Sequence, residues 1–118
     1  MPNLNDRVAL ITGAASGIGR ASAIRMATEG AKVMCADLDA AGAEATANVI
    51  NQEGGDALGC ELNVTSSEAV KATVQRTAET FGKLNVIFNN AGIAGGNWDQ
   101  TIAVNLSGAL HTMRHALP

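Results

Sequence analysis

The 118-residue sequence contains no tyrosine, only two cysteines and two prolines, and few aromatic side chains of any kind. No apolar run approaches the roughly 20 residues that a membrane-spanning helix needs, so we expect no such helix. The polar residues after Met1 lead directly into the first apolar run, without a charged and then apolar leader. We therefore expect no secretory signal, no contact with a membrane, and a cytoplasmic location.

Positive charge is also scarce. The eight lysines and arginines are scattered along the chain, and the formal net charge is -3. Proteins that bind a phosphate backbone do so with clustered basic side chains. The composition therefore argues against nucleic acid as a partner.

Cysteines and histidines offer little support for a redox or metal site. Cys35 and Cys60 have no CxxC or Cys/His spacing, so we interpret them as reduced, buried small side chains. His111 and His115 stand four residues apart on an expected helix, a spacing that can bind a metal. No carboxylate or third ligand accompanies them, so we interpret the pair as a solvated helix face and expect no metal site.

Short apolar runs alternate with helix-forming segments along the chain. The apolar share of 47% and the charged share of 16% are typical of a globular protein. The apolar runs predict strands at residues 7–12, 31–36, 57–62 and 84–88. The other segments predict helices at residues 17–29, 39–53 and 65–81, and a last helix from residue 97 with an apolar stripe of Ile102, Leu106, Leu110, Met113 and Leu117.

Polar caps and glycines mark the ends of the expected helices. Asp39 is expected to cap the second helix, and Thr65 to cap the third in a capping box with Glu68. Gly30 and Gly82 are expected to end the first and the third. The apolar face of the third helix is expected to comprise Val70, Val74, Thr77 and Phe81.

The strict alternation of strands and helices predicts an α/β fold with a Rossmann-type, doubly wound parallel sheet. Right-handed crossovers make 3-2-1-4 the simplest spatial order of the strands. Residues 1–118 are expected to form one domain, with a sheet that is incomplete after the fourth strand.

A glycine-rich turn follows the first expected strand, with the sequence Thr-Gly-Ala-Ala-Ser-Gly-Ile-Gly at residues 12–19. The start of a helix attracts a diphosphate through its N–H groups and its partial positive charge. We expect Gly13 to permit the tight turn, Gly17 to let the backbone approach the ligand, and Gly19 to let the helix pack close to the strand. A plain glycine-rich loop is the alternative, and Arg20 stands where a P-loop would have lysine.

The turn resembles the glycine motif of the short-chain dehydrogenase/reductase family, and two further segments support that likeness. Asn-Asn-Ala-Gly at residues 89–92 matches the family's motif after the fourth strand, and residues 104–106 match the segment that carries its helix asparagine, here Asn105. The resemblance covers the whole chain but only the first half of the family's length. It implies a parent enzyme that transfers hydride between a nicotinamide cofactor and a small alcohol or ketone.

The end of the second strand favours NAD as the cofactor. Asp37 stands where a carboxylate can accept hydrogen bonds from the adenosine ribose hydroxyls, and it would repel the 2′-phosphate of NADP. Ser16 and Leu38 occupy positions where family members that prefer NADP usually have a basic residue. The alternative is that Asp37 only caps a turn with Asp39.

The resemblance also implies contacts elsewhere in the chain. Asn63 and Val64 match a pair that contacts adenine, with the Asn63 carbonyl expected to accept from the adenine amino group. Thr12 is expected to brace the loop that contains Asn90, and Asn89 to be structural. The expected cofactor-binding residues are Gly13, Ser16, Gly17, Ile18, Gly19, Asp37, Leu38, Asn63, Val64, Asn90, Ala91 and Gly92.

Most of the family's catalytic residues have no counterpart here. Asn105 matches the helix asparagine, but no residue matches the serine or the tyrosine and lysine of the family's Tyr-x-x-x-Lys motif. The connection between Gly92 and Asn105 is also shorter than the family's. We therefore expect a partial cofactor-binding domain that is inactive alone.

Two alternatives remain open at this point: a non-catalytic NAD-binding module, and a structural fragment that associates through its open sheet edge. The run at residues 84–88 is apolar like a central strand, yet it would lie at the edge of the sheet, so the isolated chain is expected to self-associate. The resemblance likewise implies a homo-oligomer for the parent enzyme.

Overall fold

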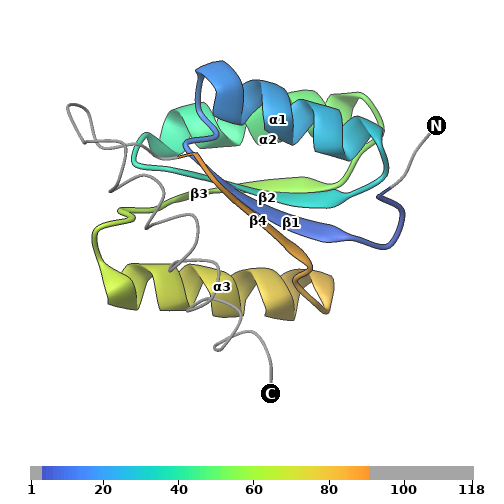
Figure 1. Cartoon of the computed structure of the whole chain (residues 1–118). Helices are drawn as coiled ribbons and strands as arrows, with labels where there is room; N and C mark the ends of the chain where they lie inside the picture. Colours follow the sequence, from blue (N-terminus) through green and yellow to red (C-terminus); the bar gives the residue numbers. More distant parts are fainter. Residues whose placement is uncertain (1–3, 91–118) are drawn as a thin grey trace.

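The computed structural model describes residues 4–90, which form four strands and three helices in strict alternation. Figure 1 shows a single sheet with helices on both of its faces. In chain order, the elements are β1 (Val8–Thr12), α1 (Gly17–Thr28), β2 (Lys32–Asp37), α2 (Ala40–Gln52), β3 (Ala57–Glu61), α3 (Ser67–Phe81) and β4 (Val86–Asn89).

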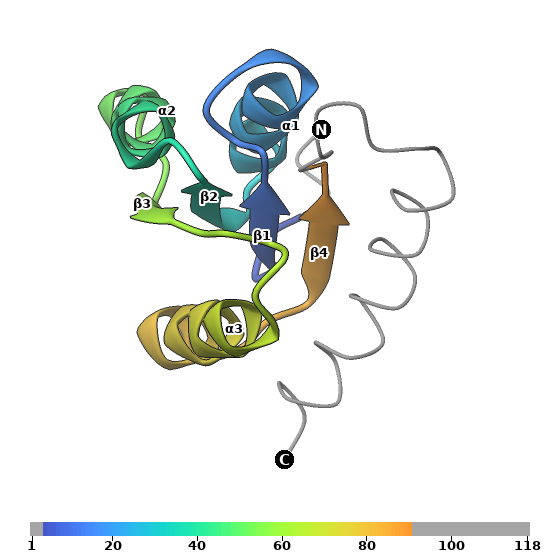
Figure 2. The ribbon, with the colours of Figure 1, turned by 90° about the vertical axis from the view of Figure 1, so that its left-hand side faces the viewer.

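The sheet confirms the expected topology. Its strands lie in the order β3-β2-β1-β4, and every neighbouring pair is parallel. Figure 2 shows α1 and α2 together on one face, with α3 on the other. Because β1 lies between β2 and β4, the chain after β1 emerges at the centre of the carboxyl edge of the sheet.

The central strand is buried on both faces, as its unbroken apolar run predicted. Ala9 and Ile11 belong to a cluster with the buried alanines of α1 and α2, whereas Leu10 belongs to a second cluster with Val74 of α3. The first cluster is rich in alanine, so α1 and α2 approach the sheet closely. This packing fixes where the N-terminal ends of both helices lie relative to the strand ends.

Gly59 in β3 has a packing role that the apolar run at residues 57–62 does not indicate. A Cβ atom at this position would lie 2.6 Å from both the N and the Cα atoms of Glu44 in α2. Side chains larger than hydrogen are therefore excluded where α2 crosses β3. The glycine sets the distance between α2 and the sheet.

The helix ends agree with the sequence at most positions, with one correction. Asp39 caps α2 by accepting from the N–H of Gly42 at 3.0 Å, and Gly82 ends α3 with a left-handed φ of 87°. Ser66, not Thr65, is the N-cap of α3, and its hydroxyl accepts from the N–H of Ala69 at 3.2 Å. The expected capping box is therefore wrong by one residue, because Thr65 is bonded to the preceding loop instead.

The expected apolar face of α3 is confirmed. Val74 and Thr77 are buried, and Val70 and Phe81 pack half-buried against the same cluster. Among residues 4–90, no helix is long and apolar enough to cross a bilayer. The expected last helix and its apolar stripe lie outside the described residues.

Both cysteines are free and buried, as expected, and they lie on opposite faces of the sheet. Burial raises the pKa of Cys35 from its ordinary 9.0 to about 12, and Cys60 adds to this rise. Burial also raises the pKa of Cys60, although Arg76 acts in the opposite direction. Both side chains are therefore neutral thiols in the folded protein near pH 8.

We expect the folded protein to resist thiol reagents at pH 8, because the reactive thiolate is disfavoured and access is blocked. Both cysteines should be modified once urea unfolds the chain, as a chromogenic disulfide reagent would measure. The stabilising effect of the protonated Cys35 thiol is fully present below pH 9 and is lost as the pH rises towards about 12. Rapid modification of both thiols without denaturant would contradict this burial.

Candidate functional site

The turn between β1 and α1 lies at the carboxyl edge of the sheet and has the geometry of an anion-binding loop. Gly13 has a φ of 65° and Gly17 a φ of 58°, which only glycine adopts without strain. The helix begins at Gly17, and its N-cap Ser16 makes no side-chain hydrogen bond to the first turn. The amide groups at the start of α1 are therefore not covered by their own capping side chain.

Two glycines of this turn have opposite surroundings. A Cβ atom on Gly19 would overlap the carbonyl oxygen of Gly13 and lie 2.9 Å from Nδ2 of Asn90. A Cβ atom on Gly17 would meet no atom within 4 Å. Gly19 thus permits α1 to pack against the turn, as expected. Gly17, in contrast, faces open space that a ligand can enter.

The carboxylate of Asp37 joins the end of β2 to the glycine turn. Its Oδ2 atom accepts from the N–H of Ala15 at 3.0 Å, and its Oδ1 atom accepts from the N–H of Asp39 at 2.9 Å. An ionised carboxylate has about four acceptor positions, so about two remain after these bonds. Asp37 therefore does cap the turn that contains Asp39, but this is only part of its role, because the same carboxylate also holds the glycine turn at Ala15.

Thr46 on α2 supports the turn through a hydrogen bond that the sequence pattern did not indicate. Its buried hydroxyl donates to the carbonyl of Ala14 at 2.8 Å and to that of Gly42 at 3.2 Å. A Cβ atom on Gly42 would lie 2.6 Å from the Cβ atom of Ala15, so α2 and the turn are in close contact. A threonine on the core face of an alanine-rich helix was the signal available in the sequence.

The ends of β1 and β4 are also joined. Thr12 and Asn89 are register partners, and the Thr12 hydroxyl donates to Oδ1 of Asn89 at 2.6 Å. Asn90 follows directly, with its side-chain amide beside Gly19. This geometry agrees with a structural role for Asn89 and with a brace from Thr12.

The loop after β3 lies beside the end of β2, because the N–H of Leu62 donates to the carbonyl of Asp37 at 2.8 Å. The Oδ1 atom of Asn63 accepts from the N–H of Thr65 at 3.0 Å and from its hydroxyl at 2.6 Å. This oxygen has two lone pairs, and both are engaged within the loop. The expectation of an Asn63 carbonyl available to adenine does not agree with this geometry.

Apolar side chains border the same edge. Leu38 and Ile18 are exposed by 67% and 69%, the largest fractions among the exposed large apolar residues described. Val64 packs against the α3-side cluster. Ala91, Gly92, Asn105, His111 and His115 lie outside the described residues.

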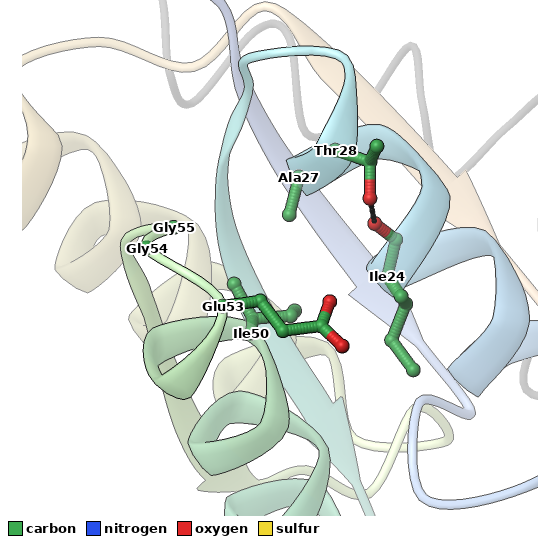
Figure 3. Close-up of a pocket in the computed structure, with 7 residues that line it drawn as sticks. All are labelled: Ile24, Ala27, Thr28, Ile50, Glu53, Gly54 and Gly55. Atoms are coloured by element: carbon green, nitrogen blue, oxygen red, sulfur yellow. Dashed lines mark hydrogen bonds between the residues drawn. The ribbon is translucent and has the colours of Figure 1, made fainter.

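A hollow of about 300 Å³ lies elsewhere, between the C-terminal ends of α1 and α2 (Figure 3). The C-terminal ends of these helices point to the amino edge of the sheet, opposite the glycine turn. Within the hollow, the Thr28 hydroxyl already donates to the carbonyl of Ile24. The lining residues are Ile24, Ala27, Thr28, Ile50, Glu53, Gly54 and Gly55.

Glu53 is the one charged residue among those seven, so the hollow offers little to fix a ligand. Within residues 4–90, no three His, Cys, Asp or Glu side chains lie close enough together to hold a metal ion. The glycine turn and its supports are therefore the candidate site.

Comparisons with known proteins show the family to which the chain belongs. A model of the short chain dehydrogenase family matches residues 7–118. D-threitol dehydrogenase of Mycolicibacterium smegmatis is 40% identical over 114 residues, which cover 89% of this chain and 44% of that protein. Cyclohexanol dehydrogenase of an Acinetobacter species is 36% identical over 124 residues, which cover 97% of this chain and 49% of that protein.

The crystal structure of a hydroxysteroid dehydrogenase from Escherichia coli superposes with a TM-score of 0.80 at 33% identity, covering 96% of this chain and 52% of that one. The chain thus spans about half the length of the relatives that it matches. The 124 positions aligned with cyclohexanol dehydrogenase exceed the 118 residues of this chain. A shortened connection between Gly92 and Asn105 would produce a difference of this kind.

We expect Thr46→Val to lower the free energy of unfolding by about 1–3 kcal/mol, because the buried Ala14 carbonyl would lose its hydroxyl donor. Thr77→Val is the matched control. Thr77 is equally buried, but its hydroxyl donates to the Thr73 carbonyl, which is also an acceptor within its own helix. Urea unfolding should show a loss below about 1 kcal/mol for the control. Equal losses for the two variants would contradict the role assigned to Thr46.

Proposed function

Because the chain belongs to the short-chain dehydrogenase family, we propose that its glycine turn and Asp37 hold the diphosphate and adenosine ribose of NAD. The observation that carries this proposal is the double hydrogen bonding of the Asp37 carboxylate, which fixes it against the turn. The family binds a nicotinamide cofactor, and the residues present fit one.

The fit rests on space and on charge. Gly17 leaves room for a diphosphate at the start of α1, where amide groups and the helix dipole favour an anion. The remaining acceptor positions of Asp37 can receive the ribose hydroxyls. Ser16, Ile18 and Leu38 border this space, and we propose that Asn90, Ala91 and Gly92 continue it on the β4 side.

The same carboxylate is the reason for proposing NAD in place of NADP. A 2′-phosphate would stand close to Asp37, and two negative charges about 4 Å apart repel by some 1 to 4 kcal/mol near a protein surface. Leu38 and Ser16 supply no compensating positive charge. We therefore propose that the site selects against the phosphorylated cofactor.

The reaction that we propose for the full-length protein is hydride transfer between nicotinamide and an alcohol or carbonyl group. The bound nicotinamide would supply the hydride donor or acceptor. Relatives named for threitol and cyclohexanol support a small alcohol or ketone as the substrate class. Asn105 is the one catalytic position of the family that we propose for this chain.

The 118 residues themselves should not turn over alcohols. The sequence has no tyrosine, so no phenol is available for the general acid/base step. Incubation with NAD and a panel of secondary alcohols should give no absorbance increase at the wavelength of reduced nicotinamide. Turnover by the purified chain would show that another group performs this step.

We further propose that these 118 residues self-associate when isolated, and, from the resemblance to the family, that the full protein is a homo-oligomer. Within residues 4–90, β4 pairs on one side only, with β1, and its side chains are half-buried. An apolar edge strand of this kind favours pairing with another strand or chain.

Titration with NAD should raise the thermal stability of the protein. At 100 times the dissociation constant, the free energy of unfolding should rise by about 2.7 kcal/mol. Gly17→Val should abolish most of this rise, because the side chain would fill the space left for the diphosphate. Scanning calorimetry with and without NAD measures the difference for each variant.

Gly54→Val provides the control for this comparison. Gly54 also has a positive φ, 90°, and open space around its Cβ position, but it lies at the amino edge of the sheet. Its substitution should cost similar backbone strain and leave the NAD-dependent rise intact. A rise retained by Gly17→Val would exclude the glycine turn as the binding site.

Comparison of NAD and NADP tests the role of Asp37. The wild-type chain should bind NAD at least about tenfold more tightly, because of the repulsion described above. Asp37→Ala should weaken NAD binding and reduce this preference, whereas Asp56→Ala, an exposed aspartate at the amino edge, should change neither. Isothermal titration gives the six dissociation constants, two for each of the three proteins. An unchanged preference in Asp37→Ala would overturn the assignment of selectivity.

A further inference from the structure

The peptide group that joins Ala14 to Ala15 in the glycine turn is hydrogen-bonded at both ends. Its carbonyl accepts from the hydroxyl of Thr46 at 2.8 Å, and its N–H donates to Oδ2 of Asp37 at 3.0 Å. A peptide group is planar, and its C=O and N–H bonds point in opposite directions. Thr46 and Asp37 therefore hold this group from opposite sides and fix its rotation.

The hydroxyl of Thr46 departs from the usual pattern of a threonine in a helix. Three other threonines in the described helices donate to the carbonyl four residues earlier, at 2.7 to 2.9 Å: Thr28, Thr73 and Thr77. For Thr46 the corresponding bond, to Gly42, is 3.2 Å long, and the shorter bond goes to Ala14. Thr46 and Ala14 are both fully buried, so water does not reach this bond.

The carboxylate of Asp37 depends on the orientation of that peptide group. Its Oδ2 atom is held by Ala15, and its Oδ1 atom accepts from the N–H of Asp39 at 2.9 Å. Anchors on both oxygens fix the plane of the carboxylate, and with it the direction of the acceptor positions that remain for a ligand. A donor to the Ala14 carbonyl also polarises the peptide group and strengthens its N–H as a donor to Asp37.

We propose that Thr46 is a positioning residue for ribose recognition, acting on Asp37 through the Ala14–Ala15 peptide group. This inference rests on the proposed function, in which the Asp37 carboxylate receives the adenosine ribose hydroxyls. Without the Thr46 hydroxyl, the peptide group is free to rotate and the Ala15 N–H no longer points at Oδ2 of Asp37. The carboxylate then turns about its remaining bond to Asp39, and its free acceptor positions turn away from the ribose.

The test is the ratio of dissociation constants for NAD and for the analogue that lacks the 2′-hydroxyl of the adenosine ribose, measured by isothermal titration on the 118-residue chain. The wild type should favour NAD by at least about tenfold, the factor expected for one hydrogen bond to a charged group. Thr46→Val should reduce this preference to below about threefold. A turn that is merely loosened would weaken the binding of both dinucleotides alike and leave the ratio unchanged.

Thr46→Ser is the conservative variant, because it keeps the hydroxyl, and it should retain the wild-type ratio. Thr77→Val removes an equally buried hydroxyl that does not contact the turn, and it should also retain that ratio. Thr46→Ala provides a second measurement in case Thr46→Val does not fold, and it should reduce the preference in the same way. Circular dichroism confirms the folding of each variant before titration.

Hydrogen exchange of the Ala15 amide tests the peptide group without any change at Thr46. Exchange should be slow in the wild type and at least about tenfold faster in Asp37→Ala, because the N–H would lose its acceptor. Equal exchange rates in these two proteins would overturn the inference. A wild-type ratio below about threefold, or a wild-type ratio retained by Thr46→Val or Thr46→Ala, would also overturn it. Failure of the wild type to bind either dinucleotide would overturn the proposed function itself, and this inference with it.

Discussion

The close approach of α1 to the carbonyl group of Gly13 is the constraint on which the candidate site depends. No side chain fits at Gly19, so the helix start and the end of β1 are fixed relative to each other. Two hydrogen bonds hold the same turn, one to Asp37 at the end of β2 and one from Thr46 on α2, and the side-chain amide of Asn90 lies beside Gly19 on the β4 side. A loop held in this way needs little rearrangement to bind an anion, which lowers the cost of ordering it on binding.

Much of this arrangement could be predicted from the sequence. The strand order followed from alternation and crossover handedness, and the positions of Gly13, Gly17 and Gly19 followed from the spacing of the motif. These features depend on local backbone conformation and on periodic burial, and both can be recognised in a sequence from the positions of glycines and apolar residues. The close contact between Gly59 and α2 was missed because it depends on the distance between two elements.

The side-chain contacts of the loops were harder to predict for a physical reason. Asn63, Thr65 and Ser66 can all accept or donate near a helix start, and their competition is decided by small differences in geometry. The structure gives the cap to Ser66 and pairs Asn63 with Thr65. Thr46 could be noticed as a threonine on the core face of an alanine-rich helix, but its partner Ala14 could not be predicted, because it is 32 positions away in the chain.

The packing of α2 on Gly59 has a consequence for the glycine turn at the carboxyl edge of the sheet. The backbone of α2 rests on this residue, and α2 carries the hydroxyl that holds the Ala14 carbonyl. A methyl group at position 59 would push the helix outward and carry Thr46 with it. Variation at this position of the outer strand is thus restricted by the glycine turn, because an alanine there would displace α2 and weaken the support that Thr46 gives to the turn.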